Sequence, residues 1–293
     1  MSGPARTDRG RASSSATRRR AGRAISLDRS LESLPLFRLS DSADDSAIVL
    51  ARDDGSRWRV IPHPGDRLPG TFDQDVYIEL VRRYHDAGRP ADGVVVFTLH
   101  NFLRSLGRRV DGRTYEQLRS ALTRLQRTVL ESNGGWFDAT SGTPWTGTFS
   151  LLSAIKIDRR RAVDADQLGL FPALPANEPG DARVTLSAQL RANIEAEYTS
   201  VIMPAQYLGL SSPVARRLYR LIAAVAAEGK SRWELPLHTV AELLPLSQRY
   251  PSHLQRVLQP AHEMLVSAGV VHRATLDAEG RQWMAIYEFD AAR

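Results

Sequence analysis

One stretch decides the fold of this chain: residues 111–132, DGRTYEQLRSALTRLQRTVLES. At the spacing of an α-helix, about 100° per residue, its side chains fall into two opposite stripes. The apolar stripe consists of Tyr115, Leu118, Leu122, Leu125 and Val129. The polar stripe consists of Arg113, Gln117, Ser120, Arg124 and Arg127, with Glu116 at its margin. The sequence therefore predicts a long helix that packs on one side and presents hydrogen-bond donors on the other.

A polar stripe of this composition suits a polyanion. Arginine and glutamine donors reach phosphate oxygens and base edges, so such a helix fits the major groove of duplex DNA. An ordinary solvated face is the alternative, because exposed arginine is common. A second helix of the same kind in the same context would favour DNA binding.

Length and composition limit the class of protein. The 293 residues are enough for two domains with separate cores. The chain has no cysteine, which excludes disulfides, a thiolate nucleophile and a zinc site built on cysteine. The apolar runs are too short to span a bilayer, and the N-terminus lacks a hydrophobic signal core. We therefore expect a cytoplasmic protein, associated with the nucleoid or a plasmid, with no membrane partner.

Positive charge is concentrated at the N-terminus. Residues 1–24 contain seven arginines and one aspartate, a net charge of +6 that equals the value for the whole chain. This segment has almost no bulky apolar residue, so we predict a disordered basic arm over residues 1–30. The arm either binds nucleic acid or is a solvated tail. Polyanion binding by the rest of the chain must come from local patches.

The first half has the order of elements typical of a winged helix-turn-helix. A turn at Asp53–Ser56 predicts a hairpin, and residues 73–87 have helical spacing that ends at Gly88 and Pro90. The later elements are a strand at 94–97, a helix after Thr98 that ends at Gly107, the helix at 111–132, a Gly134-Gly135 turn and a returning strand at 148–157. In this order the long helix reads DNA and the two-stranded ribbon is the wing.

The second half repeats this pattern after a proline-rich stretch. Its elements are a helix that starts at Ser212-Pro213, a strand at 233–235, a helix at 237–244, a long helix at 251–267 and a hairpin over 270–276 and 281–289. The leucine positions of the two long helices can be aligned, Leu118 with Leu254 and Leu122 with Leu258. Such a match indicates two diverged copies of one module.

The predicted organisation follows from this repeat. The fold class is α+β, mainly α, with two tandem winged helix-turn-helix domains and a disordered basic N-terminal arm. The predicted boundaries are the arm at 1–30, a first winged-helix domain at 31–167, a linker at 168–182 and a second winged-helix domain at 183–293.

The repeat makes the DNA interpretation the stronger one. The candidate partner is double-stranded DNA, and the predicted DNA-binding residues are those of the two polar helix faces and the base of the second wing. They are Arg109, Arg113, Gln117, Ser120, Arg124 and Arg127 in the first module, and Arg249, Ser252, His253, Arg256, Arg273 and Arg281 in the second.

Patterns for catalysis and cofactor binding do not occur in this sequence. Lys230-Ser231 resembles the end of a phosphate-binding loop, but residue 224 is alanine where the first glycine is required. The seven histidines have no metal-ligand spacing, and no tyrosine stands among clustered histidines as a DNA-nicking nucleophile would. We therefore predict no enzyme activity, no cofactor and no metal.

The chain resembles plasmid replication initiators of the replication-initiator-protein-A kind, which are related in architecture to iteron-binding Rep initiators. The resemblance spans about residues 34–289. It rests on five segments: Leu34–Ser40, Asp73–Ile78, Tyr115–Leu125, Leu210–Tyr219 and Val257–Leu265 with its internal proline.

This resemblance implies a non-enzymatic protein that binds repeated sites at a plasmid origin, helps to open the duplex and recruits the host replicative helicase. Host helicase or initiator proteins and a second copy of the chain, in a homodimer, are therefore further candidate partners. A dimeric winged-helix transcriptional repressor or partition regulator is the alternative. Direct repeats bound by monomers would favour the initiator, and one palindromic site bound by a dimer would favour the alternative.

Overall fold

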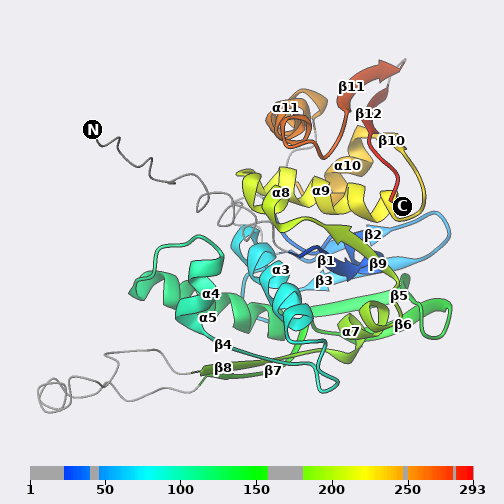
Figure 1. Ribbon diagram of the computed structural model, residues 1–293. Coiled ribbons are helices and arrows are strands. Elements are labelled where there is room, and N and C mark those ends of the chain that lie inside the picture. The colour runs from blue at the N-terminus through cyan, green and yellow to red at the C-terminus, as the bar shows by residue number, and fades with distance from the viewer. Residues whose placement is uncertain (1–22, 40–45, 158–180, 247–249, 280–281, 293) are drawn as a thin grey trace, which may run out of the picture.

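The computed structural model describes residues 23–39, 46–157, 181–246, 250–279 and 282–292 (Figure 1). This part of the chain contains nine helices and twelve strands in four sheets. Residues 1–22 of the predicted basic arm lie outside the described residues, whereas residues 25–30 form strand β1 (Ile25–Asp28) and the start of helix α2 (Arg29–Glu32). The fold is α+β, as predicted, but the expectation that it is mainly α is wrong.

The main reason for the difference is a long β-ribbon after the central helix. Strand β5 (Val129–Asp138) pairs with β6 (Thr143–Phe149) and continues through Gly134-Gly135, which the sequence predicted as a turn. The register shifts between Asn133 and Trp136, so the two glycines form a bulge within the strand. Gly134 has a φ of +69°, and a Cβ on Gly135 would lie 2.9 Å from the Arg57 carbonyl oxygen.

This ribbon extends the predicted N-terminal hairpin into a larger sheet. Strands β2 (Ile48–Ala51) and β3 (Arg57–Ile61) form the hairpin as predicted, and β3 pairs with β5 to give the sheet β2-β3-β5-β6. Trp58 and Trp136 are fully buried against this sheet with Phe149 between them.

The helices of the first half begin and end close to the predicted positions. They are α3 (Thr71–Asp86), α4 (Leu99–Ser105) and α5 (Gly112–Arg127). Thr98 caps α4 as predicted, since its hydroxyl accepts a hydrogen bond from Asn101 N. Helix α5 stops at Thr128, whose backbone is extended, so the residues from Val129 onward belong to β5 instead of the helix.

A second sheet of the first half crosses the predicted domain boundary. Strand β4 (Val94–Thr98) pairs with β8 (Asp181–Leu186), which pairs with β7 (Leu152–Ile157). Residues 158–180, between β7 and β8, lie outside the described residues and include most of the predicted linker. Strand β8 thus packs with the first half, although most of it follows the predicted linker in the sequence.

The chain then returns to its N-terminal segment. Helix α7 (Ala188–Glu195) is followed by β9 (Thr199–Ile202), which pairs with β1 (Ile25–Asp28), and β1 leads directly into the short helix α2 (Arg29–Glu32). This N-terminal segment lies in the middle of the molecule, between the two ends that carry α5 and α11 (Figure 1).

The C-terminal part repeats the arrangement around β4, β8 and β7. Its elements are α8 (Pro204–Gly209), α9 (Pro213–Ala226), β10 (Arg232–Pro236), α10 (Leu237–Leu243), α11 (Pro251–Ser267), β11 (Arg273–Glu279) and β12 (Gln282–Glu288). In the sheet β10-β12-β11, as in β4-β8-β7, the strand before the helix pair lies beside the second strand of the final hairpin.

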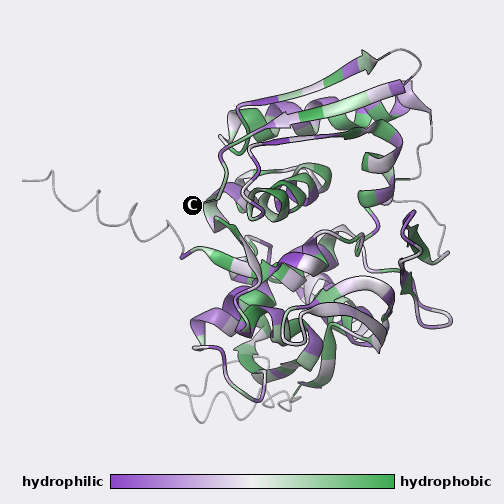
Figure 2. Cartoon of the chain, turned by 90° about the vertical axis from the view of Figure 1, so that its right-hand side faces the viewer, coloured by the Kyte–Doolittle hydropathy of each residue, from purple (hydrophilic) through white to green (hydrophobic). Residues whose placement is uncertain are grey.

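One continuous cluster of buried apolar residues runs through both parts of the molecule. The helices carry both hydrophobic and hydrophilic residues along their length, as amphipathic helices do (Figure 2). No helix in the described part of the chain is both long enough and apolar enough to cross a membrane.

Candidate nucleic-acid interface

Helix α5 has the two faces that its sequence predicts. Leu118, Leu122 and Leu125 are buried, whereas Arg113, Gln117 and Ser120 are exposed. Asp111 caps the helix by accepting a hydrogen bond from Thr114 N, and the Thr114 hydroxyl accepts one from Asp111 N in return. The first half of α5 is therefore a rigid helix with an exposed polar face.

The side chain of Arg124 binds another helix of the protein and is only partly exposed. Its guanidinium donates two hydrogen bonds to the carboxylate of Asp73, with Nη2 at 2.8 Å from Oδ1 and Nε at 3.2 Å from Oδ2. The Asp73 side chain is 3% exposed and that of Arg124 is 24% exposed. Asp73 also accepts a hydrogen bond from Gly70 N at the start of α3. The structure thus uses this predicted DNA-binding residue to join α5 to α3.

Arg127, the last residue of α5, and Arg109, in the turn before α5, differ in their contacts with other side chains. Arg127 Nη1 lies 3.1 Å from Asp66 Oδ2, and its Nη2 lies 2.8 Å from His63 Nδ1. Arg109, in the turn before α5, is 88% exposed, with its Nε 3.6 Å from Asp111 Oδ2. Arg109 therefore remains accessible to a ligand, whereas Arg127 is bound to other parts of the protein.

Helix α11 presents the second polar face. Ser252, His253 and Arg256 are exposed, and Arg273 is exposed at the start of β11. Predicted residues Arg249 and Arg281 lie outside the described residues. No acidic residue occurs in α11 before Glu263, so its first three turns offer donors and amides without a carboxylate.

A hollow of about 440 Å³ lies between α11 and the β11–β12 hairpin. It is lined by Ser252, Gln255, Arg256, Gln259, Leu276 and Trp283. Gln255 and Gln259 were not among the residues predicted from the sequence. Their spacing of four residues, on the face that also carries Ser252 and Arg256, is the signal that could have identified them.

His262 holds α11 on its sheet. It is 2% exposed, and its Nε2 lies 3.0 Å from the hydroxyl oxygen of Tyr287 in β12. Burial lowers the pKa of His262 to about 4 and raises that of Tyr287. The imidazole is therefore neutral at pH 7 and positions the helix by hydrogen bonding and packing.

Strands β7 and β8 contribute two exposed cations that the sequence analysis also missed. Lys156 in β7 and Arg183 in β8 are exposed and occupy opposite positions in the antiparallel register. Residues 158–180 separate the two strands in the sequence, and the pairing of the strands brings the two side chains together. No local pattern in the sequence indicated this pairing.

Three of the family-like segments meet in the interior of the molecule. The buried side chain of Glu32 lies 2.9 Å from Arg220 Nη1 and 3.3 Å from Arg217 Nη1. All three side chains are at most 1% exposed. Burial, followed by the charge of Arg220, lowers the pKa of Arg217 to about 9.

Further polar contacts connect α3 to α8 and α9. Gln74 Oε1 accepts a hydrogen bond of 2.6 Å from Arg220 Nη2, and Asp75 Oδ2 lies 2.6 Å from Arg216 Nη1. Asp75 also accepts a hydrogen bond from the hydroxyl of Tyr207 in α8. Arg217 Nη2 donates a hydrogen bond of 2.6 Å to the carbonyl oxygen of Leu34. The segments Leu34–Ser40, Asp73–Ile78 and Leu210–Tyr219 therefore form a buried junction between the two parts of the molecule.

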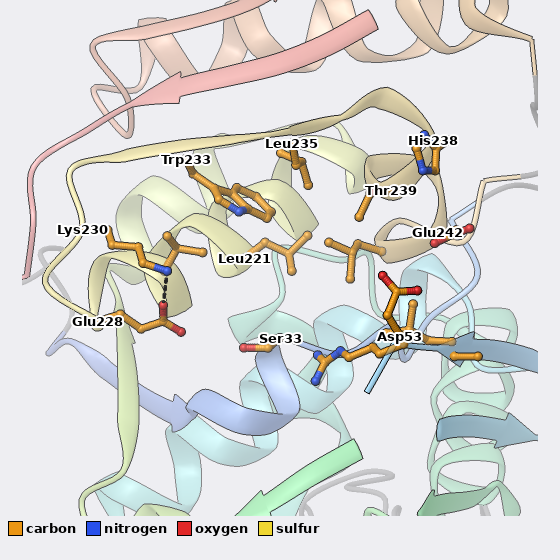
Figure 3. A pocket seen from close by; sticks show the side chains of 15 residues that line it. Ser33, Asp53, Leu221, Glu228, Lys230, Trp233, Leu235, His238, Thr239 and Glu242 are labelled. Carbon is orange, nitrogen blue, oxygen red and sulfur yellow. Dashed lines mark ion pairs between the residues drawn. The ribbon is translucent and has the colours of Figure 1, made fainter. Parts of the chain in front are cut away.

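A cleft of about 610 Å³ opens beside this junction, between β2 and the helices α9 and α10 (Figure 3). Leu221, Trp233 and Leu235 line its apolar side. Lys230, which the sequence analysis compared with a phosphate-loop lysine, points to the rim and pairs with Glu228 at 2.8 Å (Figure 3). In the described residues, no three histidine or acidic side chains gather as ligands for a metal ion.

Comparisons with known proteins give one curated relative and several solved structures. A putative replication protein from Wigglesworthia glossinidia brevipalpis is 33% identical over 72 residues, which cover 23% of this chain and only about a quarter, 26%, of that relative.

Two of the solved structures share the fold at low sequence identity. Two crystal structures of domains 2 and 3 of RctB have TM-scores of 0.57 and 0.54, each with 10% identity and 87% of this chain and 95% of that chain covered. The Pi initiator protein in complex with iteron DNA has 13% identity and a TM-score of 0.47, with 76% of this chain and 95% of that chain covered.

The family comparison covers most of the chain. The sequence model described as replication initiator protein A matches residues 27–243, which include α3, α5, α9 and the junction between them. The resemblance that the sequence analysis stated is thereby confirmed, and the chain belongs to the replication initiator protein A family.

Proposed function

We propose that this protein is a plasmid replication initiator that binds repeated duplex DNA sites at an origin through two winged-helix modules. The observation that carries the proposal is the exposed face of α11, where Ser252, His253 and Arg256 stand beside a hollow under the β11–β12 hairpin. Hydroxyl, imidazole and guanidinium groups on one helix face are donors that reach base edges and phosphates in the major groove.

The order of elements supports a winged-helix interpretation of both modules. In the second module, α9, β10, α10, α11 and the β11–β12 hairpin follow one another, and β10 pairs with β12. In the first module, α3, β4, α4 and α5 occupy the same positions, and β7–β8 take the place of the hairpin. We thus propose α5 and α11 as reading helices and the two hairpins as wings.

The distribution of exposed cations supports phosphate contacts around each reading helix. Arg109 and Arg113 flank the N-terminus of α5, and Arg183 lies on the proposed first wing. Arg273 lies at the start of β11, in the proposed second wing. Because each neutralised phosphate releases counterions, we expect affinity to fall steeply as salt increases.

Membership of the family supports the later steps that we propose. After binding, the protein promotes opening of the origin and recruits the host replicative helicase, and a second copy of the chain is a candidate partner. We propose that it acts in the cytoplasm on plasmid DNA, by binding rather than by catalysis and without a cofactor.

Footprinting of the purified chain on DNA that flanks its own gene tests the proposal, in moderate salt and with competitor duplex. We expect protection of direct repeats, each about two helical turns long because two tandem reading helices contact it. Protection of a single inverted repeat at the promoter would instead indicate a dimeric repressor. Absence of any protection above competitor would refute duplex recognition.

A further inference from the structure

The first turn of α3 connects three parts of the molecule through consecutive residues. Asp73 binds Arg124 of α5, Gln74 accepts a hydrogen bond from Arg220 of α9, and Asp75 binds Arg216 of α9. The carboxylate of Asp75 also lies 3.5 Å from Arg108 Nη2, in the turn that joins α4 to α5. One helical turn therefore contacts both the reading-helix region of the first module and the first helix of the second.

Glu32 strengthens the same connection from the N-terminal segment. It pairs with Arg217 and Arg220 and accepts a hydrogen bond from the hydroxyl of Tyr77 in α3. Arg217 also donates to the carbonyl oxygens of Glu32 and Leu34, at 2.8 and 2.6 Å. Because moving any one partner would leave a buried charge uncompensated, this set of contacts favours a single geometry.

The second reading helix is attached to the same framework. The α8 side chain Gln206 donates a hydrogen bond to the carbonyl oxygen of Ala268 at the end of α11, and α9 packs against α11. Tyr219 of α9 in turn donates to Gln206. Both α5 and α11 are thus held, through α3 and α9, relative to one cluster of side chains.

We propose that this cluster fixes the spacing and rotational phase of the two DNA segments that α5 and α11 contact. We call it the α3–α9 hub, and its members are Glu32, Asp73, Gln74, Asp75, Arg216, Arg217 and Arg220. They are positioning residues, because their side chains are buried or half-buried and bind other groups of the protein. The inference rests on the proposed function, and it adds that the protein selects sites by the distance between two sequence elements as well as by their bases.

The physical reason is effective concentration. When one module is bound, a rigid hub places the other at its own DNA segment only if the two segments have the matching separation. Insertion of about five base pairs turns the second segment to the opposite side of the duplex. We expect this insertion to weaken binding by about 100-fold, since the contribution of one module is then lost.

The first experiment measures the wild-type chain on duplexes made from a footprinted repeat of its own gene region, with zero to ten base pairs inserted at the centre. A preference of about 100-fold for the native spacing over the five-base-pair insertion supports the hub. Binding that is specific but equally tight at every spacing overturns the hub and leaves the proposed function intact. A chain that binds no flanking duplex better than competitor overturns the proposed function itself.

The second experiment compares Asp75→Asn with the matched control Glu79→Gln. Both residues are buried carboxylates of α3, but Glu79 pairs with Arg82, Arg83 and Ser105, all within the first module. We expect Asp75→Asn to reduce the preference for native spacing about tenfold and Glu79→Gln to leave it unchanged. Arg216→Gln, at a half-buried position, provides the same comparison if Asp75→Asn does not fold.

The readout separates positioning from general stability. Both α3 variants lose a charged hydrogen bond, so we expect both to unfold more readily than the wild type. Only the hub variant should show a smaller difference in affinity between the native and the altered spacings. A folded Asp75→Asn or Arg216→Gln chain with the wild-type spacing profile would show that the hub does not set the spacing.

Discussion

The two proposed reading helices are anchored by different chemistry. Helix α5 is fixed by ion pairs of its own polar stripe, with Arg124 bound to Asp73 and Arg127 bound to Asp66. Helix α11 is fixed from its inner side, where His262 contacts Tyr287 and leucines pack on the sheet. Its described candidates for DNA contact have no ion-pair partner within the described part of the chain.

This difference shows that one sequence pattern has two uses. The C-terminal half of the α5 stripe joins the helix to the rest of the protein, so only Arg113, Gln117 and Ser120 of that stripe are available to a ligand. The stripe of α11 is available from Ser252 to Arg256, and Gln259 donates a hydrogen bond to Glu263. We therefore expect α11 to provide more of the base recognition. We expect α5 to provide fewer contacts with DNA, because two of its arginines fix the helix to the rest of the protein.

Loss of the α5 anchor should have the largest effect. Arg124→Ala leaves the Asp73 carboxylate buried without its charged partner, and we expect the free energy of unfolding to fall by about 3 kcal/mol. This value is at the lower end for buried pairs because Arg124 itself is a quarter exposed. Urea unfolding of the full chain measures it, and Arg113→Ala, which removes an exposed arginine of the same helix, is the control. Equal stability of the two variants would contradict the anchor.

The Arg124 result shows what the sequence could and could not predict. Helical spacing identified both long helices and their buried leucines, because packing against a core repeats along one face. The spacing could not distinguish Arg124 from Arg113, since both lie on the polar stripe and Asp73 is 51 residues away in the sequence. Family-like segments likewise predicted membership correctly, but nothing local indicated that three of them meet in a buried junction.

The sheets were the least predictable part of the fold. Gly134-Gly135 resembles a turn in the sequence, and only its pairing with β3 and β6 converts it into a bulge inside a strand. Strand β8 follows the proline-rich stretch, so its partners β4 and β7 depend on contacts distant in the sequence. Because of these pairings, the strands that we propose as the first wing are β7 and β8, and not the ribbon after α5 that the sequence predicted.

The anchor of α11 should depend on pH. Burial lowers the pKa of His262 to about 4 in the folded chain, whereas an unfolded histidine has a pKa of about 6.5. The unfolded state therefore binds more protons between these values, and stability is lost as the pH falls from about 6.5 towards 4. We expect His262 to account for a loss of about 2–3 kcal/mol by pH 4.5, measured as the difference between the wild type and His262→Gln in urea unfolding at several pH values.

The variant comparison is needed because Asp28 acts in the opposite direction. Burial raises the pKa of its carboxyl to about 7, so the folded state binds the extra proton and acidification from pH 7 towards 3.8 adds stability. The wild-type curve contains both effects, and subtraction of the His262→Gln curve isolates the histidine. Parallel curves for the two proteins would show that His262 does not titrate as a buried group.

Removal of an exposed arginine from α11 should affect DNA binding without affecting stability. Arg256→Ala is expected to weaken binding to the footprinted site by about 1–3 kcal/mol, with relaxed preference at one base pair, if its guanidinium reads a base. Fluorescence anisotropy with a set of single-base-pair variants of the site measures both effects. Uniform weakening on all duplexes would assign Arg256 to a phosphate, and unchanged binding would remove α11 from the interface.

The smallest effect is expected for Arg127 at the end of α5. Its guanidinium is bound by Asp66 and His63, and because the pair is partly exposed its loss should change stability by no more than about 1 kcal/mol. We expect Arg127→Ala to leave affinity for the site within about twofold, and the slope of affinity against salt to stay unchanged because no phosphate contact is lost. Titrations of the variant and the wild type at several salt concentrations measure both quantities. A tenfold loss with a shallower slope would mean that Arg127 leaves Asp66 when DNA binds, and that the whole stripe of α5 then contacts DNA as the stripe of α11 does.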